Sequence, residues 1–276
     1  MAAIRSLQPA LRSLVRNPIL LVVTGAVGIL QLPQLLAPTT GPLLSTVISL
    51  GMSGVLLLFL PFYQGGILGM GDEARNGSTS IGTLIEVGKS NYVSLLLSYV
   101  VVLAIAVAFG IIVGLLTVVG GIGLIVGGGQ SSPGFLAVSP AILAVGGIVS
   151  LLLVVGYLGT MVFIQFYGHE IVLNDAAVAE AFTGSIGLVR NNLLSTIGYS
   201  LIIFGGGGLI GAISAATSFL VAPQEPFQSF VPELSLPLVI GAAVVSLLAT
   251  AVLGAFYATY SVTFYRELTG ASRTRL

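Results

Sequence analysis

The sequence predicts an all-α polytopic membrane protein with six transmembrane helices, and two observations carry that prediction. First, 56% of the 276 residues are hydrophobic and 7% are charged, with a mean hydropathy of +1.11, whereas an ordinary soluble domain is roughly 25% charged. Second, several apolar runs exceed the ~20 residues with which a helix crosses the ~30 Å hydrocarbon core. Only helices or a closed barrel satisfy the backbone in lipid, and runs of this length favour helices.

Residues 4–16 have the pattern of an amphipathic helix that lies on the membrane surface. Five apolar side chains fall at helical spacing on one face, and three arginines lie largely off it. The apolar set is Ile4, Leu7, Leu11, Leu14 and Val15, and the basic set is Arg5, Arg12 and Arg16. Ser6 is a suitable N-cap, and Pro18 separates this helix from the first transmembrane block. No cleavage site closes that block, so we expect it to stay in the mature protein.

Loops rich in proline, glycine or polar residues bound the six apolar blocks. We expect transmembrane helices over residues 18–36, 43–70, 92–126, 140–172, 192–221 and 238–267. The second block exceeds the hydrocarbon thickness at ~1.5 Å per residue, so it tilts, bends near Pro61 or projects beyond the lipid. Glycines in the second half of the third block, and at Gly205 to Gly208 in the fifth, permit close helix contacts or bends.

The charge distribution predicts that both termini are cytoplasmic. Six crossings place the N-terminus, residues 71–91, residues 173–191 and the C-terminus on one side, and all nine Lys and Arg residues lie there or at its boundary. The opposite loops carry no basic residue and hold Glu225 and Glu233. Because cytoplasmic loops are enriched in Lys and Arg, the basic side is the cytoplasm.

Recurring motifs predict three tandem hairpins within a single transmembrane domain of residues 1–276. A basic residue shortly before Asn precedes the first, third and fifth blocks, as in Leu14-Val15-Arg16-Asn17, Lys89-Ser90-Asn91 and Leu188-Val189-Arg190-Asn191. Aromatic residues close the other three blocks. The pseudo-repeats span approximately residues 4–70, 72–172 and 175–267, each with a cytoplasmic amphipathic helix. Alternatively, basic and aromatic residues simply gather at the cytoplasmic interface, as in any membrane protein.

Seven polar residues at the cytoplasmic ends of helices are candidate functional residues. They are His169, Glu170, Asp175, Glu180 and Arg190, together with Asp72 and Glu73. A histidine beside carboxylates could shuttle protons or contribute to a cation site. Alternatively, the pair His169-Glu170 is an ordinary interfacial group that is hydrated or pairs with Arg190, and Asp72 and Glu73 form an exposed charge cluster.

Aromatic and amide side chains form a second candidate group at the cytoplasmic ends of the second, fourth and sixth blocks. The group consists of Tyr63, Gln64, Gln165, Tyr167 and Tyr260. In a threefold arrangement these side chains could converge on one vestibule. Otherwise they belong to the aromatic belt of the membrane interface, with the glutamines joining helices by hydrogen bonds.

The composition excludes several kinds of site. With no cysteine and a single histidine, thiolate and histidine-cluster metal sites are excluded, and we expect no cofactor. The glycine runs lack the lysine and the strand of a P-loop, so they do not predict a nucleotide site. No charged residue lies in the middle of an apolar block, which argues against an ion-coupled transporter.

Three motifs carry a resemblance to known families: F-x-P-F-Y-x-G-G-I-L-G-M from Phe59 to Met70, the E-A-x-x-G steps at Glu73 and Glu180, and T-Y-S-V-T-F-Y from Thr259 to Tyr265. With them the chain resembles, over nearly its whole length, a family of six-helix membrane proteins from haloarchaea. It is more distantly similar to the membrane domain fused to some bacterial glycerophosphodiester phosphodiesterases. The hydrolase domain of that second group has no counterpart in this chain, and neither resemblance implies catalytic residues.

The leading functional hypothesis is a non-catalytic membrane protein that organises partners or lipids through its cytosolic amphipathic helices, because polar residues concentrate there. The alternative is a permease or channel subunit with a path between the second, fourth and sixth helices, and a membrane-embedded enzyme ranks last. We expect the lipid bilayer as a partner and no nucleic acid, and a protein partner or a homo-oligomer is left open. The expected location is the cell membrane, with both termini cytoplasmic.

Overall fold

The computed structural model describes residues 2–37, 41–127, 140–221 and 236–273. Within these ranges the chain is helical and contains no strand, so the predicted all-α fold class is confirmed. The chain divides into two compact units. Unit 1 comprises Met1–Leu96 and Phe166–Leu276, and unit 2 comprises Leu97–Gln165.

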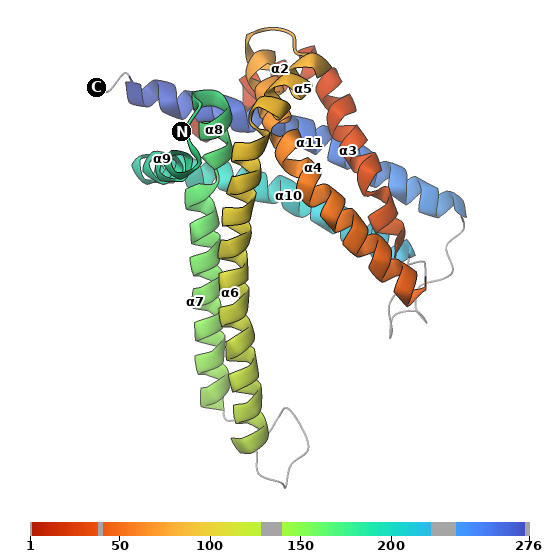
Figure 1. Cartoon of the computed structure of the whole chain (residues 1–276), viewed down its shortest axis with the longest axis vertical. Helices are drawn as coiled ribbons and strands as arrows, with labels where there is room; N and C mark the ends of the chain where they lie inside the picture. The colour runs from red at the N-terminus through yellow and green to blue at the C-terminus, as the bar shows by residue number, and fades with distance from the viewer. Residues whose placement is uncertain (1, 38–40, 128–139, 222–235, 274–276) are drawn as a thin grey trace. The chain divides into compact units, whose positions relative to one another are not determined.

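Unit 1 contains both short and long helices (Figure 1). The short ones are α1 (Ala2–Arg5), α2 (Leu7–Arg16), α5 (Ile81–Ser90), α8 (Tyr167–Asn174) and α9 (Val178–Asn191). The long ones are α3 (Ile19–Leu36), α4 (Pro42–Asn76), α10 (Leu193–Val221) and α11 (Leu236–Arg273). Helix α6 (Tyr92–Gly127) begins in unit 1 and continues into unit 2, which also contains α7 (Pro140–Ile164).

Unit 2 is a pair of long apolar helices. Residues 97–165 contain no Asp, Glu, Lys or Arg. The rings of Phe109 on α6 and Tyr157 on α7 meet edge to face with their centroids 5.4 Å apart, a geometry that aromatic pairs favour. Most of the other described apolar side chains on these two helices are exposed, such as Ile111 and Leu151, which is the surface expected of helices that contact lipid.

Helix α11 is the central element of unit 1. It packs against α2, α3, α4 and α10 (Figure 1). The close contact with α3 involves Gly254, which faces Thr24, and the Thr24 hydroxyl donates a 2.7 Å hydrogen bond to the carbonyl of Ala251. Further along α11, residues 259–265 are buried throughout, including the large side chains of Tyr260 and Phe264. The conspicuous T-Y-S-V-T-F-Y motif is therefore a core segment.

Glycines allow α5 to fold back closely against α4. A Cβ atom added to Gly66 would collide with the backbone carbonyl of Leu84, and one added to Gly69 would lie 2.7 Å from the side chain of Val87. The relation is mutual, because a Cβ at Gly88 on α5 would lie 2.7 Å from the carbonyl of Phe62. Small residues at such contacts let two helix backbones approach each other in lipid.

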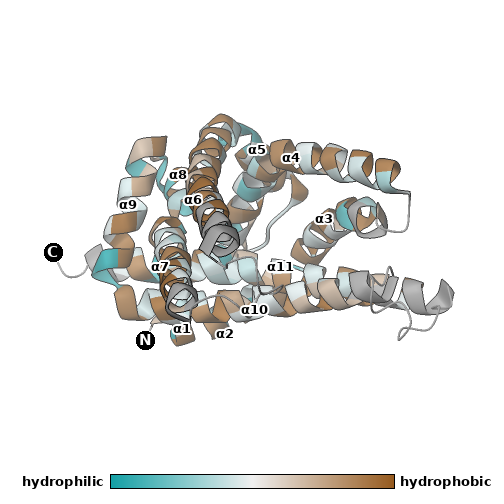
Figure 2. Cartoon of the chain, turned by 90° about the horizontal axis from the view of Figure 1, so that it is seen from below, coloured by the Kyte–Doolittle hydropathy of each residue, from teal (hydrophilic) through white to brown (hydrophobic). Residues whose placement is uncertain are grey.

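Five described helices are long and apolar enough to cross a membrane, and a sixth crossing results if the bent pair of Ala2–Arg16 and Ile19–Pro33 counts as one span. The bend within that pair is 85°. Apolar residues dominate α4, α6 and α7 (Figure 2), and many of their large side chains are exposed, such as Leu43 and Leu50 on α4. Exposed apolar surfaces of this extent are typical of helices that contact the lipid of a membrane. The chain is therefore a multi-pass membrane protein.

Three predicted transmembrane helices differ from the observed ones at their C-terminal ends. The sixth was predicted to end at residue 267, but α11 continues to Arg273. The second was predicted to end at residue 70, but α4 continues to Asn76, where Gly77 donates a backbone hydrogen bond to Glu73. The fourth was predicted to run unbroken to residue 172, but α7 ends at Ile164 and α8 begins at Tyr167. At this break the backbone N–H of Phe166 donates to the hydroxyl of Ser185 at 3.1 Å, a partner that lies on α9.

The predicted N-terminal helix also divides into two, at Ser6. Ser6 does not cap α2 as predicted. Its hydroxyl instead lies within hydrogen-bond distance of the Ala2 carbonyl and of the carboxylate of Glu267, at 2.9 and 2.7 Å. The break therefore forms where the N-terminal segment contacts the end of α11. The predicted loops at 128–139 and around Glu225 and Glu233 lie outside the described residues.

Candidate functional site

A bidentate ion pair joins the ends of α4 and α11. Arg266 donates from Nε and Nη2 to the two carboxylate oxygens of Asp72, at 2.9 and 2.8 Å. Both side chains are about 30% exposed or less, so the pair is only partly screened by water. Asp72, one of the predicted site residues, thus fixes the orientation of an arginine that lies 194 positions later in the chain.

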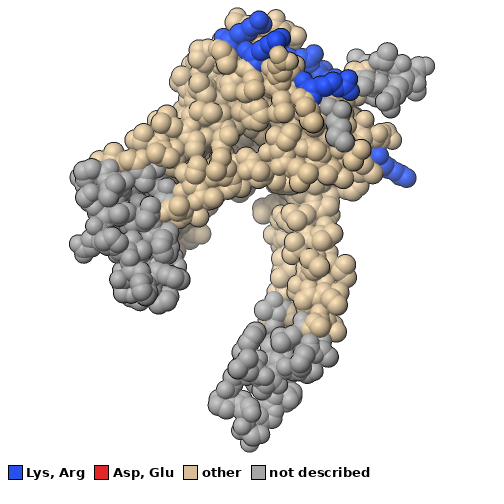
Figure 3. All heavy atoms as spheres, turned by 180° about the vertical axis from the view of Figure 1, so that it is seen from behind, with Lys and Arg blue, Asp and Glu red and all other residues tan. Residues whose placement is uncertain are grey.

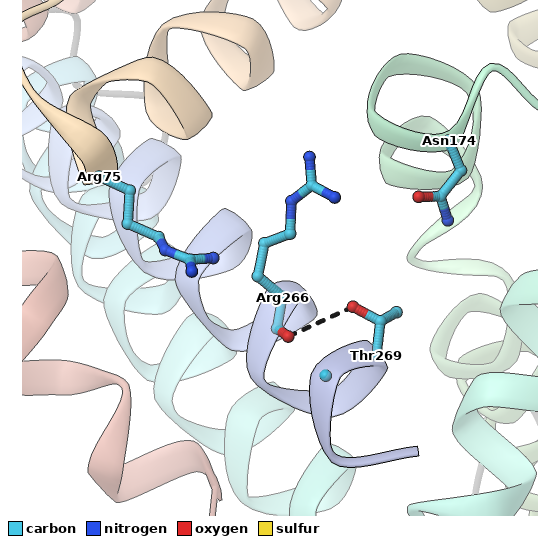
Figure 4. Close-up of a pocket in the computed structure, with 5 residues that line it drawn as sticks. Arg75, Asn174, Arg266 and Thr269 are labelled. Carbon is cyan, nitrogen blue, oxygen red and sulfur yellow. Dashed lines mark hydrogen bonds between the residues drawn. The ribbon is translucent and has the colours of Figure 1, made fainter. Parts of the chain in front are cut away.

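A pocket of ≈ 160 Å³ opens beside this ion pair. Its lining comes from three helices of unit 1: Arg75 from α4, Asn174 from α8, and Arg266, Thr269 and Gly270 from α11. Figure 4 shows Arg266 between Arg75 on one side and Asn174 on the other, with the guanidinium of Arg75 directed toward Arg266. Thr269 donates to the Arg266 carbonyl at 3.3 Å within α11. The pocket therefore presents two guanidinium groups on a small concave surface.

Asn174 is held in place by two neighbours. Its Nδ2 group donates to the Tyr265 hydroxyl at 2.6 Å and to Oε2 of Glu170 at 2.9 Å. Glu170 itself lies against Gly184 of α9, where a Cβ atom would come within 3.2 Å of its carboxyl carbon. The predicted site residue Glu170 is thus a support for the pocket wall.

His169 is buried in an aromatic cluster, with only 2% of its surface exposed. Its ring stacks on Tyr265 at 5.2 Å and meets Phe166 edge to face at 5.5 Å. Neither ring nitrogen has a hydrogen-bond partner among the described residues. The prediction that His169 is a hydrated interfacial group is therefore wrong, because the α7–α8 break and the packing of α11 enclose the ring.

The remaining acidic candidates serve local structure at separate places. The carboxylate of Glu73 accepts hydrogen bonds from the hydroxyls of Thr79 and Thr83, which ties the end of α4 to the start of α5. Asp175 ends α8 in the left-handed conformation, with φ of 53°. Glu180 accepts a long 3.4 Å hydrogen bond from the backbone of Ala177 at the start of α9.

Arg190 is exposed near the end of α9, and within the described ranges no carboxylate pairs with it. The expected pairing of the histidine segment with Arg190 is thus not formed. The residues that the structure describes contain no group of three or more His, Asp or Glu side chains that could hold a metal ion.

The predicted vestibule residues make different contacts. Tyr260 is fully buried, and its hydroxyl donates to the Ala3 carbonyl at 3.0 Å. Tyr167 stacks on Phe182 at 5.1 Å. The other three are placed as follows: Tyr63 packs against the core formed by α2, α3, α4 and α11, Gln64 lies beside Gly168, and Gln165 belongs to unit 2.

The N-terminal helices α1 and α2 carry a mixed apolar and basic surface. Ile4, Leu11 and Val15 are 66, 50 and 80% exposed, and we call these three residues the apolar stripe. Arg5, Arg12 and Arg16 are exposed next to them in sequence. On the face of unit 1 drawn in Figure 3, basic side chains gather along one edge and no acidic side chain is visible.

This surface differs from the predicted amphipathic face in one respect. Leu14 was predicted to share the apolar face, but it is buried in the core with Leu20 and Met70. The helix therefore has two apolar sides, one against the protein and one free. Leu14 is buried because α2 packs against α4 and α11.

Each amphipathic helix that precedes a long helix ends in an asparagine with the same hydrogen bond. Asn17, Asn91 and Asn192 each donate from Nδ2 to the carbonyl four residues earlier, at 2.9, 3.1 and 3.0 Å. In the third helix the asparagine that makes this bond is Asn192, one residue later than the Asn191 of the recurring sequence motif. Asn17 makes further bonds, to the carbonyl of Gly77 and from the backbone N–H of Thr79, so it also fixes the α4–α5 connection.

Sequence reasoning missed all five residues that line the pocket. None of them was predicted as a site residue, although Arg266 directly follows the T-Y-S-V-T-F-Y motif. An arginine at the end of an apolar helix resembles an ordinary interfacial anchor. Its contact with Asp72 depends on how α4 and α11 pack, which no local pattern reports.

The family model described as "Domain of unknown function (DUF7847)" matches residues 1–268. In the comparisons with curated proteins and with solved structures, nothing matches. The family match extends from α1 to the end of the core segment of α11 and includes every residue that lines the pocket except Thr269 and Gly270. The chain therefore belongs to the family of the domain of unknown function DUF7847.

Proposed function

We propose that this chain is a non-catalytic membrane module that organises lipids or a protein partner at its cytoplasmic surface. The observation that carries the proposal is the apolar stripe of Ile4, Leu11 and Val15 beside exposed arginines on α1 and α2. An apolar face bordered by Arg suits the boundary between lipid headgroups and acyl chains. It also suits a partner helix that presents an apolar face with acidic flanks.

Rigid attachment of α2 supports this role. Its inner side packs through Leu14 into the core, Ser6 just before it bonds Glu267, and Asn17 at its end bonds the α4–α5 connection. A helix fixed in this way loses little conformational entropy when it binds, which favours affinity. The stripe is thus a preformed surface rather than a segment that must first order.

The proposal places the basic ends of the helices on the cytoplasmic side of the cell membrane. All nine Lys and Arg residues lie outside residues 97–165, and none falls between residues 191 and 265. Basic residues next to membrane helices are retained on the cytoplasmic side, where anionic lipids attract them by about 1 kcal/mol per residue. The predicted resemblance to six-helix haloarchaeal membrane proteins and the predicted threefold repeat are compatible with this placement.

Crosslinking and co-purification test the proposal. The chain is purified in mild detergent after crosslinking in its own membrane, and bound proteins and lipids are identified by mass spectrometry. We expect a reproducible partner or lipid set, and we expect Leu11→Gln combined with Val15→Gln to lose most of it. The control Ser78→Gln introduces the same side chain at an exposed position between α4 and α5, away from α1 and α2, and should keep the set.

A monomer without reproducible protein or lipid partners would count against the proposal. Equal recovery from the wild type and the double variant would also contradict it, because the stripe would then contribute nothing.

A further inference from the structure

The pocket between α4, α8 and α11 has more positive than negative charge in its lining. Arg75 and Arg266 both line it, and the carboxylate of Asp72 is used by Nε and Nη2 of Arg266. In the described part of the chain no Asp or Glu pairs with Arg75. Two neighbouring cations repel each other unless an anion lies between them.

The orientation of the two guanidinium groups leaves donors for a ligand. Asp72 accepts hydrogen bonds from Nε and Nη2 of Arg266. The Nη1 group of Arg266 makes no hydrogen bond within the described ranges. Arg75 is exposed, and its whole guanidinium is available. Guanidinium groups match the geometry of phosphate and carboxylate oxygens and bind them through paired N–H donors.

The rest of the lining limits the kind of anion. Asn174 uses Nδ2 on Tyr265 and Glu170, so its amide oxygen remains as an acceptor for a hydroxyl group. A pocket of ≈ 160 Å³ exceeds several times the roughly 30 Å³ that one water molecule occupies in the liquid. The site therefore offers donors for an anionic group and an acceptor for an attached hydroxyl.

We propose that this pocket binds a phosphate ester whose alcohol part carries a free hydroxyl, with Arg75 and Nη1 of Arg266 on the phosphate oxygens and Asn174 on the hydroxyl. The phosphate belongs either to a membrane lipid headgroup such as phosphoglycerol or to a small phosphorylated molecule from the cytosol. This proposal rests on the proposed function in one respect, because that function places the pocket on the cytoplasmic side of the membrane. It deepens that function by naming the chemistry of the lipid or ligand.

Thermal unfolding of the full chain in a neutral detergent tests the proposal. Circular dichroism is the suitable probe because the chain contains no tryptophan. The ligands are inorganic phosphate, glycerol 1-phosphate and a short-chain phosphatidylglycerol, compared with sodium chloride at equal ionic strength and with a short-chain diacylglycerol that lacks phosphate. A ligand that binds only the folded state raises the unfolding temperature with concentration.

Arg75→Gln is the decisive variant, because Arg75 is exposed and unpaired in the described chain, so its removal should leave the fold intact. Loss of one charge-assisted contact should weaken the apparent affinity about tenfold or more. The matched control is Lys89→Gln, which removes an exposed positive charge from α5 outside the pocket and should leave the affinity unchanged.

The outcomes separate the two phosphate sources. Stabilisation by glycerol 1-phosphate that Arg75→Gln abolishes assigns the site to a soluble phosphate ester, and stabilisation by the phospholipid alone assigns it to a headgroup. No stabilisation by any phosphate compound, or equal loss in Lys89→Gln, overturns the proposal. Phosphate binding without co-purified partners would contradict the proposed function and support the phosphate site. Co-purified partners without phosphate binding would support the proposed function and contradict the phosphate site.

Discussion

At the scale of single residues, His169 is a buried polar ring without polar contacts in the described structure. It stacks on Tyr265, meets Phe166 at its edge and leaves both nitrogens without a partner. Burying an unsatisfied polar group costs on the order of 1–3 kcal/mol. We therefore expect His169→Phe to raise the free energy of unfolding by about 1 kcal/mol, measured as a higher midpoint of thermal unfolding in detergent.

The control for this prediction is Tyr265→Phe, which keeps a ring in the stack but removes the hydroxyl that accepts from Asn174. It should lower stability by about 1 kcal/mol, the usual net value of one hydrogen bond. If His169→Phe instead destabilised the protein by more than Tyr265→Phe, the imidazole would have a polar role that the observed contacts do not explain.

At the scale of the element, α4 carries glycines in two different environments. Gly66 lies against the Leu84 backbone carbonyl, whereas Gly54 has nothing within 4 Å of its Cβ position. We expect Gly66→Ala to lower the free energy of unfolding by roughly 1–3 kcal/mol, because a backbone atom cannot move aside cheaply. Gly54→Ala should leave stability unchanged or raise it by up to ~1 kcal/mol through helix propensity. Similar unfolding midpoints for the two variants would mean that α5 does not rest on α4 as observed.

The elements themselves were largely predictable, but their junctions were not. Apolar runs predicted helices that begin within about two residues of the observed ones, because a helix in lipid starts where polar sequence stops. The break between α7 and α8 depends on Ser185, which lies 19 residues from its partner Phe166. Likewise, the continuation of α4 past residue 70 depends on contacts with α5 and α11. Neither partner can be recognised from the local pattern.

At the scale of the whole molecule, the candidate site was predicted only in part. Asp72 and Glu170 were predicted as polar residues of interest, and they prove to support the pocket through Arg266 and Asn174. Their partners are recognisable only after packing brings α4, α8 and α11 together. By contrast, the separation of charge in the chain is visible in the sequence, because residues 97–165 carry none and the basic residues all precede or follow them.

That separation allows a test of the predicted orientation by thiol labelling. The chain has no cysteine, so a single introduced cysteine reports its own position. Ser78 is exposed between α4 and α5, and Gly41 precedes α4 with open space around its Cβ position. With the basic side cytoplasmic, a membrane-impermeant maleimide should label Gly41→Cys in intact cells and Ser78→Cys only after the membrane is opened. Labelling of Ser78→Cys from outside would show that the charges do not set the orientation, and labelling of both from outside would mean that α4 does not cross the membrane.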